Sequence, residues 1–410
     1  MMDEGLYGAN GSSAVTEWVR ETMRRQPTIG YCTNVHAGTS LESICANLQE
    51  HAHVVRQQLE LDTLPVGLWL PAPVAEQLED PRQLDQLAAC LDELQLHPYT
   101  LNGFPFGNFH GEVVKHEVYR PAWWEPSRGD YTLRLARHMA ALLPEGDSAS
   151  ISTLPLGWPW PEVSKAHLNE AARSLSEVAR QLRELDLQTG RHIRLCLEPE
   201  PGCLLQTSDD AVVFFEQVLR PVIDDPATLR HLGICHDVCH AVVMREPQAE
   251  AIQRYVDADI PIHKVQISSC VQVDFDRLDD AQANVALSQL NRFAEDRYLH
   301  QTTVCHQGIT EFFVDLPDAI RRAQLDGPRG EWRTHFHVPI HLERFKTLET
   351  SQPAIAACIA ALQTHDLACD IEVETYAWSV LPTELQTPVL AEGIATELGW
   401  LHGTLAAMPS

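Results

Sequence analysis

LCLEPEPG, Leu195–Gly202, places two glutamates and two prolines at the end of an apolar strand pattern. Side chains alternate between the two faces of a strand, so Glu198 and Glu200 share one face. An ionised carboxylate is rarely buried without a partner, and the prolines remove backbone N–H groups that would otherwise donate to it. A bound cation at the strand end is the simplest compensation. The alternative is a strand that ends one residue earlier and leaves both glutamates in solvent.

The same succession of an apolar strand and an amphipathic helix recurs along the chain. It begins at TIGYCTNVHAG, residues 28–38, and continues to the C-terminal helix. Strands that alternate with helices are joined by parallel crossovers, and eight such units close into a barrel. The sequence therefore predicts an α/β protein with one (β/α)8 TIM-barrel domain over residues 28–410. An open doubly wound sheet is the alternative, but no GxGxxG motif follows the first strand to support it.

Two segments fall outside this repeat. Residues 1–27 form an extension ahead of the barrel and begin with a stretch rich in Gly, Ser and Asn. Between the seventh strand, HKVQISS, and the last strand, THFHVPI is a ninth strand candidate. We assign residues 270–334 to an insertion before the last strand, in which the extended pieces form a small hairpin beside the barrel mouth. The strand register after Ser269 stays open.

The composition excludes several classes of partner. A formal net charge of −27 over 410 residues repels nucleic-acid phosphates and anionic membrane surfaces. Eleven cysteines without a CxxC pair are typical of a reducing compartment. The first residues lack a basic segment followed by an apolar run, and no stretch approaches about 18 consecutive apolar residues. We therefore expect a cytoplasmic protein with no membrane insertion and a small-molecule partner.

Polar side chains also end the strand that follows Glu198 along the chain. HLGICHDVCH places Asp237 at the strand end and His240 three residues later. This spacing supplies an oxygen ligand and a nearby imidazole. The alternative makes Asp237 a helix N-cap and His240 a surface residue of the first turn. Gln266 lies in the middle of the next apolar strand, which indicates that it faces something polar inside the barrel.

The last strand, IEVETYAW, repeats the pattern of the first quotation. Glu372 and Glu374 share a face, and Glu374 lies nearer the mouth. THFHVPIH adds His335 and His337, which are two apart, either as metal ligands or as hydrogen-bonding and substrate-binding groups. Acidic, amide and imidazole groups from successive strands predict an oxygen-rich site for one divalent metal ion. Room for six ligands favours Mn, Mg or Co, with Zn as a further candidate.

Other side chains are candidates for the mouth of the barrel. His36 follows the first strand, Asn102 ends the third, and His110 lies in the long loop after it; each either contacts substrate or stabilises its loop. Tryptophans on two loops form an aromatic lid over the same face or pack a homodimer interface: Trp123, Trp124, Trp158 and Trp160.

These motifs resemble those of the xylose isomerase-like barrels, which include sugar isomerases and ketose epimerases. The resemblance runs from about Thr28 to the C-terminus and depends on LEPEP, HDVCH, VQI and VETY. It implies a single divalent ion held by four residues, namely Glu198, Asp237, Gln266 and Glu374. Within this superfamily, YCTNVHAG, TLNGFPFGNFHG, SISTLP and HFHVPI are similar to the EboE group of metabolite traffic proteins, whose context is secondary-metabolite processing or movement.

The resemblance implies a metal-dependent isomerase or epimerase of a sugar, cyclitol or prenyl-linked metabolite. Glu198 and Glu374 would exchange a proton with carbon beside an oxygen held by the ion. Other residues of the site would bind substrate or support the ligands: His36, Asn102, His110, Glu200, His240, His335 and His337. Xylose isomerase has a lysine where this chain has Glu200, which argues against lysine-assisted aldose isomerisation. The alternatives are a non-catalytic metabolite carrier and a metal-dependent hydrolase of the endonuclease IV-like branch.

Overall fold

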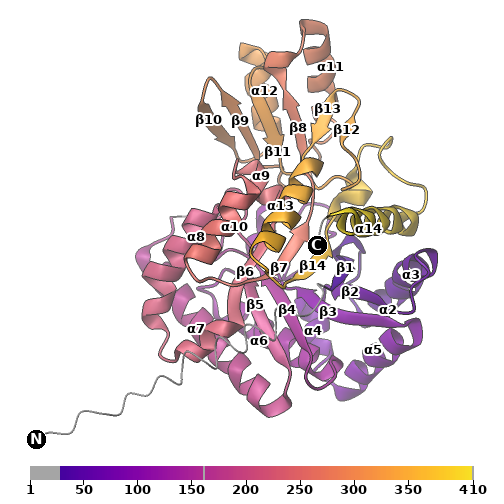
Figure 1. Cartoon of the computed structure of the whole chain (residues 1–410), viewed down its shortest axis with the longest axis vertical. Helices are drawn as coiled ribbons and strands as arrows, with labels where there is room; N and C mark the ends of the chain where they lie inside the picture. The colour runs from indigo at the N-terminus through magenta and orange to yellow at the C-terminus, as the bar shows by residue number, and fades with distance from the viewer. Residues whose placement is uncertain (1–27, 160–161, 409–410) are drawn as a thin grey trace, which may run out of the picture.

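A computed structural model of the chain describes residues 28–159 and 162–408. Eight parallel strands close into a barrel in the order β1-β14-β7-β6-β5-β4-β3-β2 (Figure 1). The predicted TIM barrel is therefore confirmed, and the predicted extension, residues 1–27, lies outside the described residues. The barrel strands are β1 (Ile29–Cys32), β2 (Leu64–Leu68), β3 (Leu96–Asn102), β4 (Ser148–Thr153), β5 (His192–Leu197), β6 (Leu232–Asp237), β7 (Ile262–Ile267) and β14 (Asp370–Val373).

Helices surround the barrel. The sequence of α5 (Pro81–Leu94) explains why this segment is helical. Asp80 accepts a hydrogen bond from the Arg82 amide at the N-terminus of the helix, and Leu87, Leu91 and Leu94 are buried on one face. The helices around the barrel are α2 (Leu41–Asn47), α3 (His53–Gln58), α4 (Ala72–Gln77), α5 (Pro81–Leu94), α6 (Pro126–Leu142), α7 (Lys165–Thr189), α8 (Ser208–Phe214), α9 (Val238–Val243), α10 (Gln248–Asp257), α13 (Gln352–Thr364) and α14 (Leu390–Ala407).

A second sheet projects from one end of the barrel between β7 and β14 (Figure 1). It has six antiparallel strands in the order β10-β9-β11-β8-β13-β12, so the predicted small hairpin is wrong. The sheet also continues past residue 334, where the predicted insertion ends. Its strands are β8 (Val271–Asp274), β9 (Thr302–His306), β10 (Ile309–Phe313), β11 (Glu331–Thr334), β12 (Arg344–Phe345) and β13 (Leu348–Thr350), and it carries α11 (Asp280–Leu290) and α12 (Leu316–Asp326).

Only the first part of THFHVPI is a strand. β11 ends at Thr334, and His335 and His337 lie in the irregular segment after it. The His335 amide donates to Gln301 O at 2.8 Å and the Val338 amide donates to Ser269 O at 2.9 Å, so the segment is fixed between the projecting sheet and the end of β7. These bonds bring both histidines to the mouth of the barrel.

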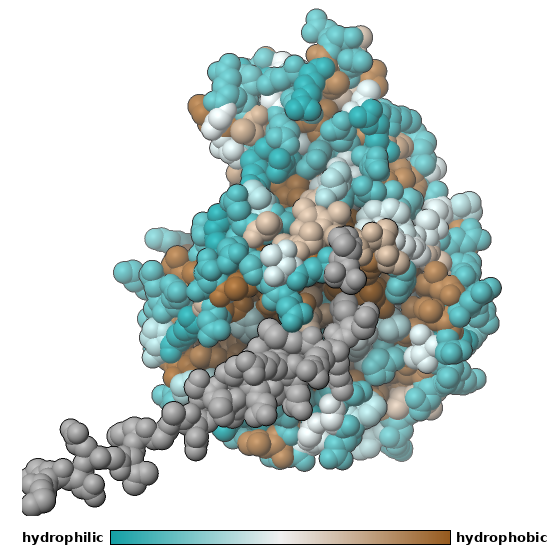
Figure 2. Space-filling view, viewed as in Figure 1, coloured by the Kyte–Doolittle hydropathy of each residue, from teal (hydrophilic) through white to brown (hydrophobic). Residues whose placement is uncertain are grey.

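The surface of the projecting sheet is largely hydrophilic in the face shown in Figure 2. Ile309 and Leu325 are exposed exceptions on this part of the molecule. None of the described helices is long and apolar enough to cross a membrane.

Candidate metal centre

Three carboxylates meet at the carboxyl ends of the barrel strands. Glu198 directly follows β5, Asp237 is the last residue of β6, and Glu374 directly follows β14. One oxygen of each lies within 4.8 Å of the others, and the side chains are almost fully buried. The carboxyl ends of parallel barrel strands lie at the same rim. Three carboxylates from segments that are far apart in sequence therefore lie close together.

Glu374 is held by two amide side chains. Asn34 Nδ2 and Asn102 Nδ2 donate to its Oε1 at 2.7 and 2.9 Å. The pKa of Glu374 is raised to about 8, first because burial penalises its charged form and then because Asp237 and Glu372 add negative charge nearby. Two donors on one oxygen fix the direction of the carboxylate and leave its other oxygen facing the site.

Asp237 and Glu198 are buried to a similar degree but differ in their partners. Asp237 Oδ1 accepts hydrogen bonds from the His240 amide and from Ser268 Oγ, both at 2.8 Å. Burial acts to raise the pKa of Asp237, but the nearby His240 and His337 and these hydrogen bonds lower it overall. The pKa of Glu198 is well above its usual range because of burial, followed by the charges of Glu374 and Asp237. The predicted alternative is present only in part: Asp237 caps α9, but His240 is buried and is not a surface residue.

The polar atoms that face this cluster lack partners of their own. Within residues 28–159 and 162–408, Glu198 Oε2 and Asp237 Oδ2 form no hydrogen bond, although both are buried. The amide of Gln266, deeper in the barrel, is also unpaired. Buried polar groups are ordinarily satisfied, so two unpaired carboxylate oxygens at one point are suited to binding a cation. The residues present therefore fit a divalent ion.

His337 adds an imidazole from the irregular segment after β11. Its Nδ1 lies 2.8 Å from Glu374 O and donates to it, which leaves a lone pair on Nε2. That Nε2 has no hydrogen-bond partner among the described residues and lies 3.8 Å from Asp237 Oδ2. A neutral imidazole with its other nitrogen bonded to a carbonyl is the usual form of a histidine metal ligand.

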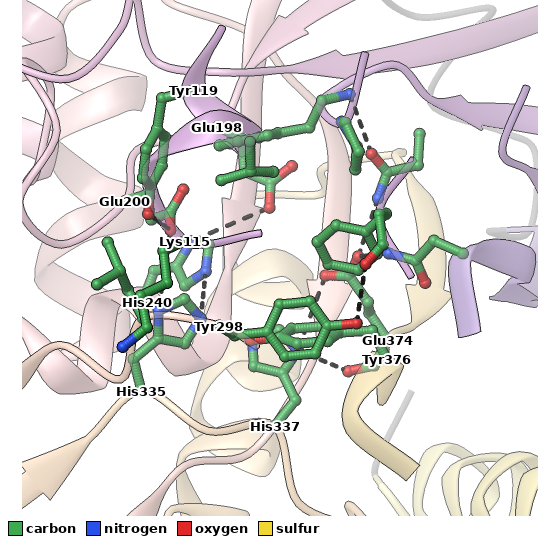
Figure 3. A pocket seen from close by; sticks show the side chains of 17 residues that line it. Lys115, Tyr119, Glu198, Glu200, His240, Tyr298, His335, His337, Glu374 and Tyr376 are labelled. Atoms are coloured by element: carbon green, nitrogen blue, oxygen red, sulfur yellow. Dashed lines mark hydrogen bonds and ion pairs between the residues drawn. The ribbon is translucent and has the colours of Figure 1, made fainter. Parts of the chain in front are cut away.

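Glu198 and Glu374 of the cluster, together with His337, line a pocket with about 530 Å³ of empty volume, including space open to solvent. Glu200, His240 and His335 gather on one side of Glu198, and Glu374 lies on the other (Figure 3). Aromatic side chains line its walls: Phe104, Phe109, Tyr119, Tyr298 and Tyr376. Polar groups at one end and aromatic rings around them suit a polar, ring-shaped small molecule.

Some predicted site residues lie elsewhere. His36 is buried beside Tyr31, whose hydroxyl is 3.1 Å from its Nε2, and stacks on His51, so it faces a helix and does not line the pocket. His110 lies behind the pocket, where its Nε2 contacts Asn34 O at 2.7 Å. Gln266 is fully buried inside the barrel, beside Glu372 on the neighbouring strand.

The predicted tryptophan lid is wrong for Trp123, which is fully buried in the core. Trp158 stacks on Tyr119 with ring centroids 4.8 Å apart, and Trp124 stacks on His167. Both line a second groove outside the metal cluster. Trp160 lies outside the described residues.

Comparison with solved structures shows the same architecture. A barrel from Mycobacterium smegmatis, in complex with magnesium, matches with a TM-score of 0.50 and 13% identity over 93% of this chain and 98% of that one. The fold is that of a xylose isomerase-like barrel. A xylose isomerase domain protein from Planctomyces limnophilus matches at a TM-score of 0.49 with 14% identity, over 93% of this chain and 98% of that one. D-Allulose 3-epimerase from Methylomonas sp., in complex with D-allulose, matches at 0.46 with 12% identity, over 93% and 97%.

Neither a protein-family model nor a curated protein matches the sequence, so the similarity to EboE stays a prediction.

Several pocket residues of this barrel were not predicted. Asn34 is the clearest, because it lies two residues after the end of β1 in YCTNVHAG, and a polar residue near a barrel strand end is itself a signal. Tyr298 and Tyr376 reach the pocket from the projecting segment and from the loop after β14. Only the tertiary arrangement of these two segments brings the rings together, so the sequence carried no local signal for them.

Proposed function

We propose that this protein is a divalent-metal-dependent isomerase or epimerase of a sugar-like or cyclitol-like substrate. The observation that carries the proposal is the buried triad Glu198, Asp237 and Glu374, whose ligand atoms lie within 4.8 Å of one another and of which Glu198 and Glu374 line the pocket. The magnesium in the similar barrel from M. smegmatis supports the choice of a divalent ion. A role in secondary-metabolite processing remains a prediction from the resemblance to EboE.

Four side chains would hold the ion. Glu198, Asp237 and Glu374 supply carboxylate oxygens, and His337 supplies its free Nε2. Gln266 is a predicted ligand whose unpaired amide lies deeper in the barrel. When bound, such an ion polarises the oxygens next to a C–H bond, which lowers the barrier to removing that proton.

The remaining chemistry belongs to the carboxylates. Glu198 and Glu374 lie on different sides of the floor, so one takes a proton from the substrate carbon and the other returns a proton to it. Asn34 and Asn102 keep Glu374 in a single orientation through their hydrogen bonds to its Oε1. The aromatic wall excludes water from the carbanion-like centre.

Solvent-hydrogen exchange tests the proposal directly. Protein loaded with Mn²⁺ is incubated in D₂O with a panel of ketoses, inososes and related cyclitols, and deuterium incorporation is followed by NMR. We expect deuterium exchange at a carbon next to a carbonyl. The rate of this exchange should fall by about 100-fold or more in Glu198→Gln and in Glu374→Gln. Glu397→Gln is the matched control, since Glu397 is an equally buried carboxylate on α14 outside the pocket.

Metal content separates catalysis from simple binding. A metabolite carrier does not depend on a Lewis acid, so purified carrier would hold substoichiometric metal and give no exchange with any compound of the panel. That pair of results would reject the isomerase proposal. Tight metal binding with hydrolysis of a phosphodiester in place of exchange would favour the hydrolase alternative.

A further inference from the structure

A second groove lies beside the pocket of the metal centre. It has about 1530 Å³ of empty volume, including space open to solvent, and is larger than the pocket, for which the same volume is about 530 Å³. Its walls come from the loop between β3 and α6, the loop between β4 and α7, α7 itself, and Val314, which directly follows β10. The proposed mechanism assigns this groove no role.

The groove and the pocket share one wall. The 3-10 helix η3 (Lys115–Tyr119) contributes residues to the lining of both cavities, and Tyr119 lines both at once. The Tyr119 hydroxyl donates to Glu200 Oε1 at 2.8 Å in the pocket (Figure 3), and its ring stacks on Trp158 in the groove. The two cavities are therefore neighbours on either side of one short helical segment.

Two tryptophans line the groove with their rings. Trp158 stacks on Tyr119 with ring centroids 4.8 Å apart, and Trp124 stacks on His167 with ring centroids 5.2 Å apart. Each ring is thus covered on one face by its partner. Both tryptophans are only partly buried, so part of each ring remains available to a ligand in the groove.

Two glycines make room for these rings. A Cβ atom at Gly157 would lie 2.8 Å from Trp124 Cη2, and a Cβ atom at Gly202 would lie 2.4 Å from Trp158 Cη2. Gly202 has a φ of +84°, which favours glycine as well. It ends the segment LCLEPEPG, so the same stretch of chain that supplies Glu198 to the metal centre also supports Trp158 in the groove.

Apolar side chains of the projecting sheet extend the aromatic wall. Phe312 is 36% exposed and Val314 is 39% exposed. Val314 lines the groove, and Phe312 Cζ lies 3.2 Å from the Cβ position of Gly202, next to Trp158. Apolar surface that is exposed beside a concave site is typical of ligand-binding grooves.

The chemistry of the lining favours a neutral ring that carries hydroxyl groups. The face of an aromatic ring is negative, so the C–H groups on the face of a sugar ring pack favourably against it. The carboxylates of Glu117, Glu125 and Glu162 can accept hydrogen bonds from hydroxyl groups. Arg120 is the single arginine or lysine among the described lining residues, so the excess negative charge disfavours a phosphorylated ligand.

We propose that the groove binds the second ring of a neutral glycoside whose first ring lies at the metal centre. The pocket supplies the carboxylates that hold the ion, and the groove supplies stacking surfaces, so the two cavities divide a two-ring substrate between them. The position of the first ring rests on the proposed function. The stacking of a sugar ring on Trp124 and Trp158 depends on no reaction.

Isothermal titration calorimetry of the full chain loaded with Mn²⁺ tests the groove without any reaction. The probes are the neutral disaccharides maltose, cellobiose, lactose and sucrose, with methyl glucoside as the single-ring reference. We expect at least one disaccharide to bind about tenfold more tightly than methyl glucoside, which is the effect of one good aromatic contact. A panel in which no disaccharide exceeds the affinity of methyl glucoside would overturn the proposal.

Two substitutions locate the effect. Trp158→Ala should abolish the preference for the disaccharide and leave the affinity for methyl glucoside unchanged, and Trp124→Ala should weaken disaccharide binding in the same direction. Trp400→Ala is the matched control, since Trp400 is also partly buried but lies on α14 and lines neither cavity. Circular dichroism checks that each variant is folded. Folded Trp158→Ala and Trp124→Ala proteins with the affinity of the wild type would refute the assignment.

A crystal structure with the tightest disaccharide of the panel gives the position of both rings. We expect one sugar ring against Trp158 and the other in the pocket beside Glu198. A disaccharide bound elsewhere would reject the proposal. Phenyltrimethylammonium chloride is the competing probe, because aromatic rings beside carboxylates also attract cations. Binding of this cation at the groove, with no binding of any disaccharide, would assign the groove to a cationic ligand instead.

The deuterium-exchange assay separates this proposal from the proposed function. Exchange with a free ketose, combined with no preference for disaccharides, would reject the groove as a sugar site and leave the isomerase proposal standing. Disaccharide binding that depends on Trp158, combined with no exchange of any compound, would support the sugar site in the groove and reject the isomerase chemistry.

Discussion

Lys264 Nζ lies 2.6 Å from Glu372 Oε2, and both side chains are fully buried inside the barrel. Lys264 is on β7, and Glu372 is on β14, two residues before Glu374. The ammonium is the cation beneath the carboxylate cluster, and its charge lowers the pKa of both Glu198 and Glu374 against the larger effect of burial. The charge of Lys264 therefore favours the ionised forms of Glu198 and Glu374.

Lys264→Met should destabilise the protein strongly. The substitution leaves the Glu372 carboxylate buried without its cation, a loss that costs about 3–5 kcal/mol in the free energy of unfolding. Urea unfolding followed by fluorescence measures the change. Lys346→Met is the control, since Lys346 makes an exposed pair with Glu384 and should change stability by less than about 1 kcal/mol.

The double variant Lys264→Met with Glu372→Leu should recover much of the loss, because no unpaired charge remains. A Lys264→Met variant as stable as the wild type would contradict the prediction that this ion pair stabilises the fold.

Gly67→Ala should disturb the same carboxylate from β2, which is separated from β14 by β1 alone. A Cβ atom at Gly67 would lie 1.4 Å from Glu372 Oε1, so β2 needs glycine to leave space for the side chain. We expect a loss of about 1–3 kcal/mol in the free energy of unfolding, as for other overpacked interiors. Gly403→Ala, on α14 with no atom within 4 Å of the added Cβ, should instead be neutral or slightly stabilising. Equal effects of the two substitutions in chemical denaturation would contradict the steric argument.

Much of the barrel and the carboxylate cluster could be predicted from sequence because both depend on local rules. Alternation of strand and helix patterns determines a parallel barrel, and a barrel brings its strand ends to one rim. Glu198, Asp237 and Glu374 each follow or end an apolar strand, so their convergence required no knowledge of the intervening chain.

The projecting sheet could not be predicted in the same way. Its strand β10 is exposed on nearly every residue and so lacks the alternation that marks a half-buried strand. β8 pairs with β11, and β11 pairs with β9, across long loops, so register depends on tertiary contacts. The predicted position of His36 at the pocket was wrong for a similar reason. His36 comes soon after a barrel strand, which alone predicts a place at the mouth, but it stacks on His51, a residue of the following helical segment.

Glu397 should make stability depend on pH. This buried carboxyl accepts hydrogen bonds from Thr375 Oγ1, the Ile340 amide and Trp378 Nε1, but burial outweighs them and raises its pKa from 4.5 to about 7. A raised pKa means that the folded state binds the proton more tightly than the unfolded state. This contribution to stability is therefore complete below about pH 4.5 and disappears as pH rises through 7.

The shift of about 2.5 pH units corresponds to about 3 kcal/mol between pH 4.5 and pH 7 or above. Urea unfolding of wild type and Glu397→Gln across this range isolates the contribution, because other titrating groups cancel in the difference. The variant should lose stability relative to the wild type at pH 4.5 and regain it by pH 8. A constant difference across the range would show that the carboxyl of Glu397 does not titrate in this window.

Metal binding at the carboxylate triad should release protons near neutral pH. The pKa of Glu374 is about 8 in the metal-free protein, so at pH 7 this side chain is mostly protonated, and the pKa of Glu198 is also raised. A divalent cation binds the ionised form, so its apparent affinity rises with pH until the solution is above about pH 8. Below that value the affinity should fall by about tenfold per pH unit for each proton released.

Calorimetric titration of Mn²⁺ in two buffers with different ionisation enthalpies counts the protons directly, and we expect at least one per ion at pH 7. Asn34→Ala removes a hydrogen bond that lowers the pKa of Glu374, so its pH profile should move to higher pH while its limiting affinity at pH 9 changes less. An affinity that is independent of pH between 6 and 8 would mean that the carboxylates are already ionised without metal. Their negative charge would then be compensated by other groups in the barrel.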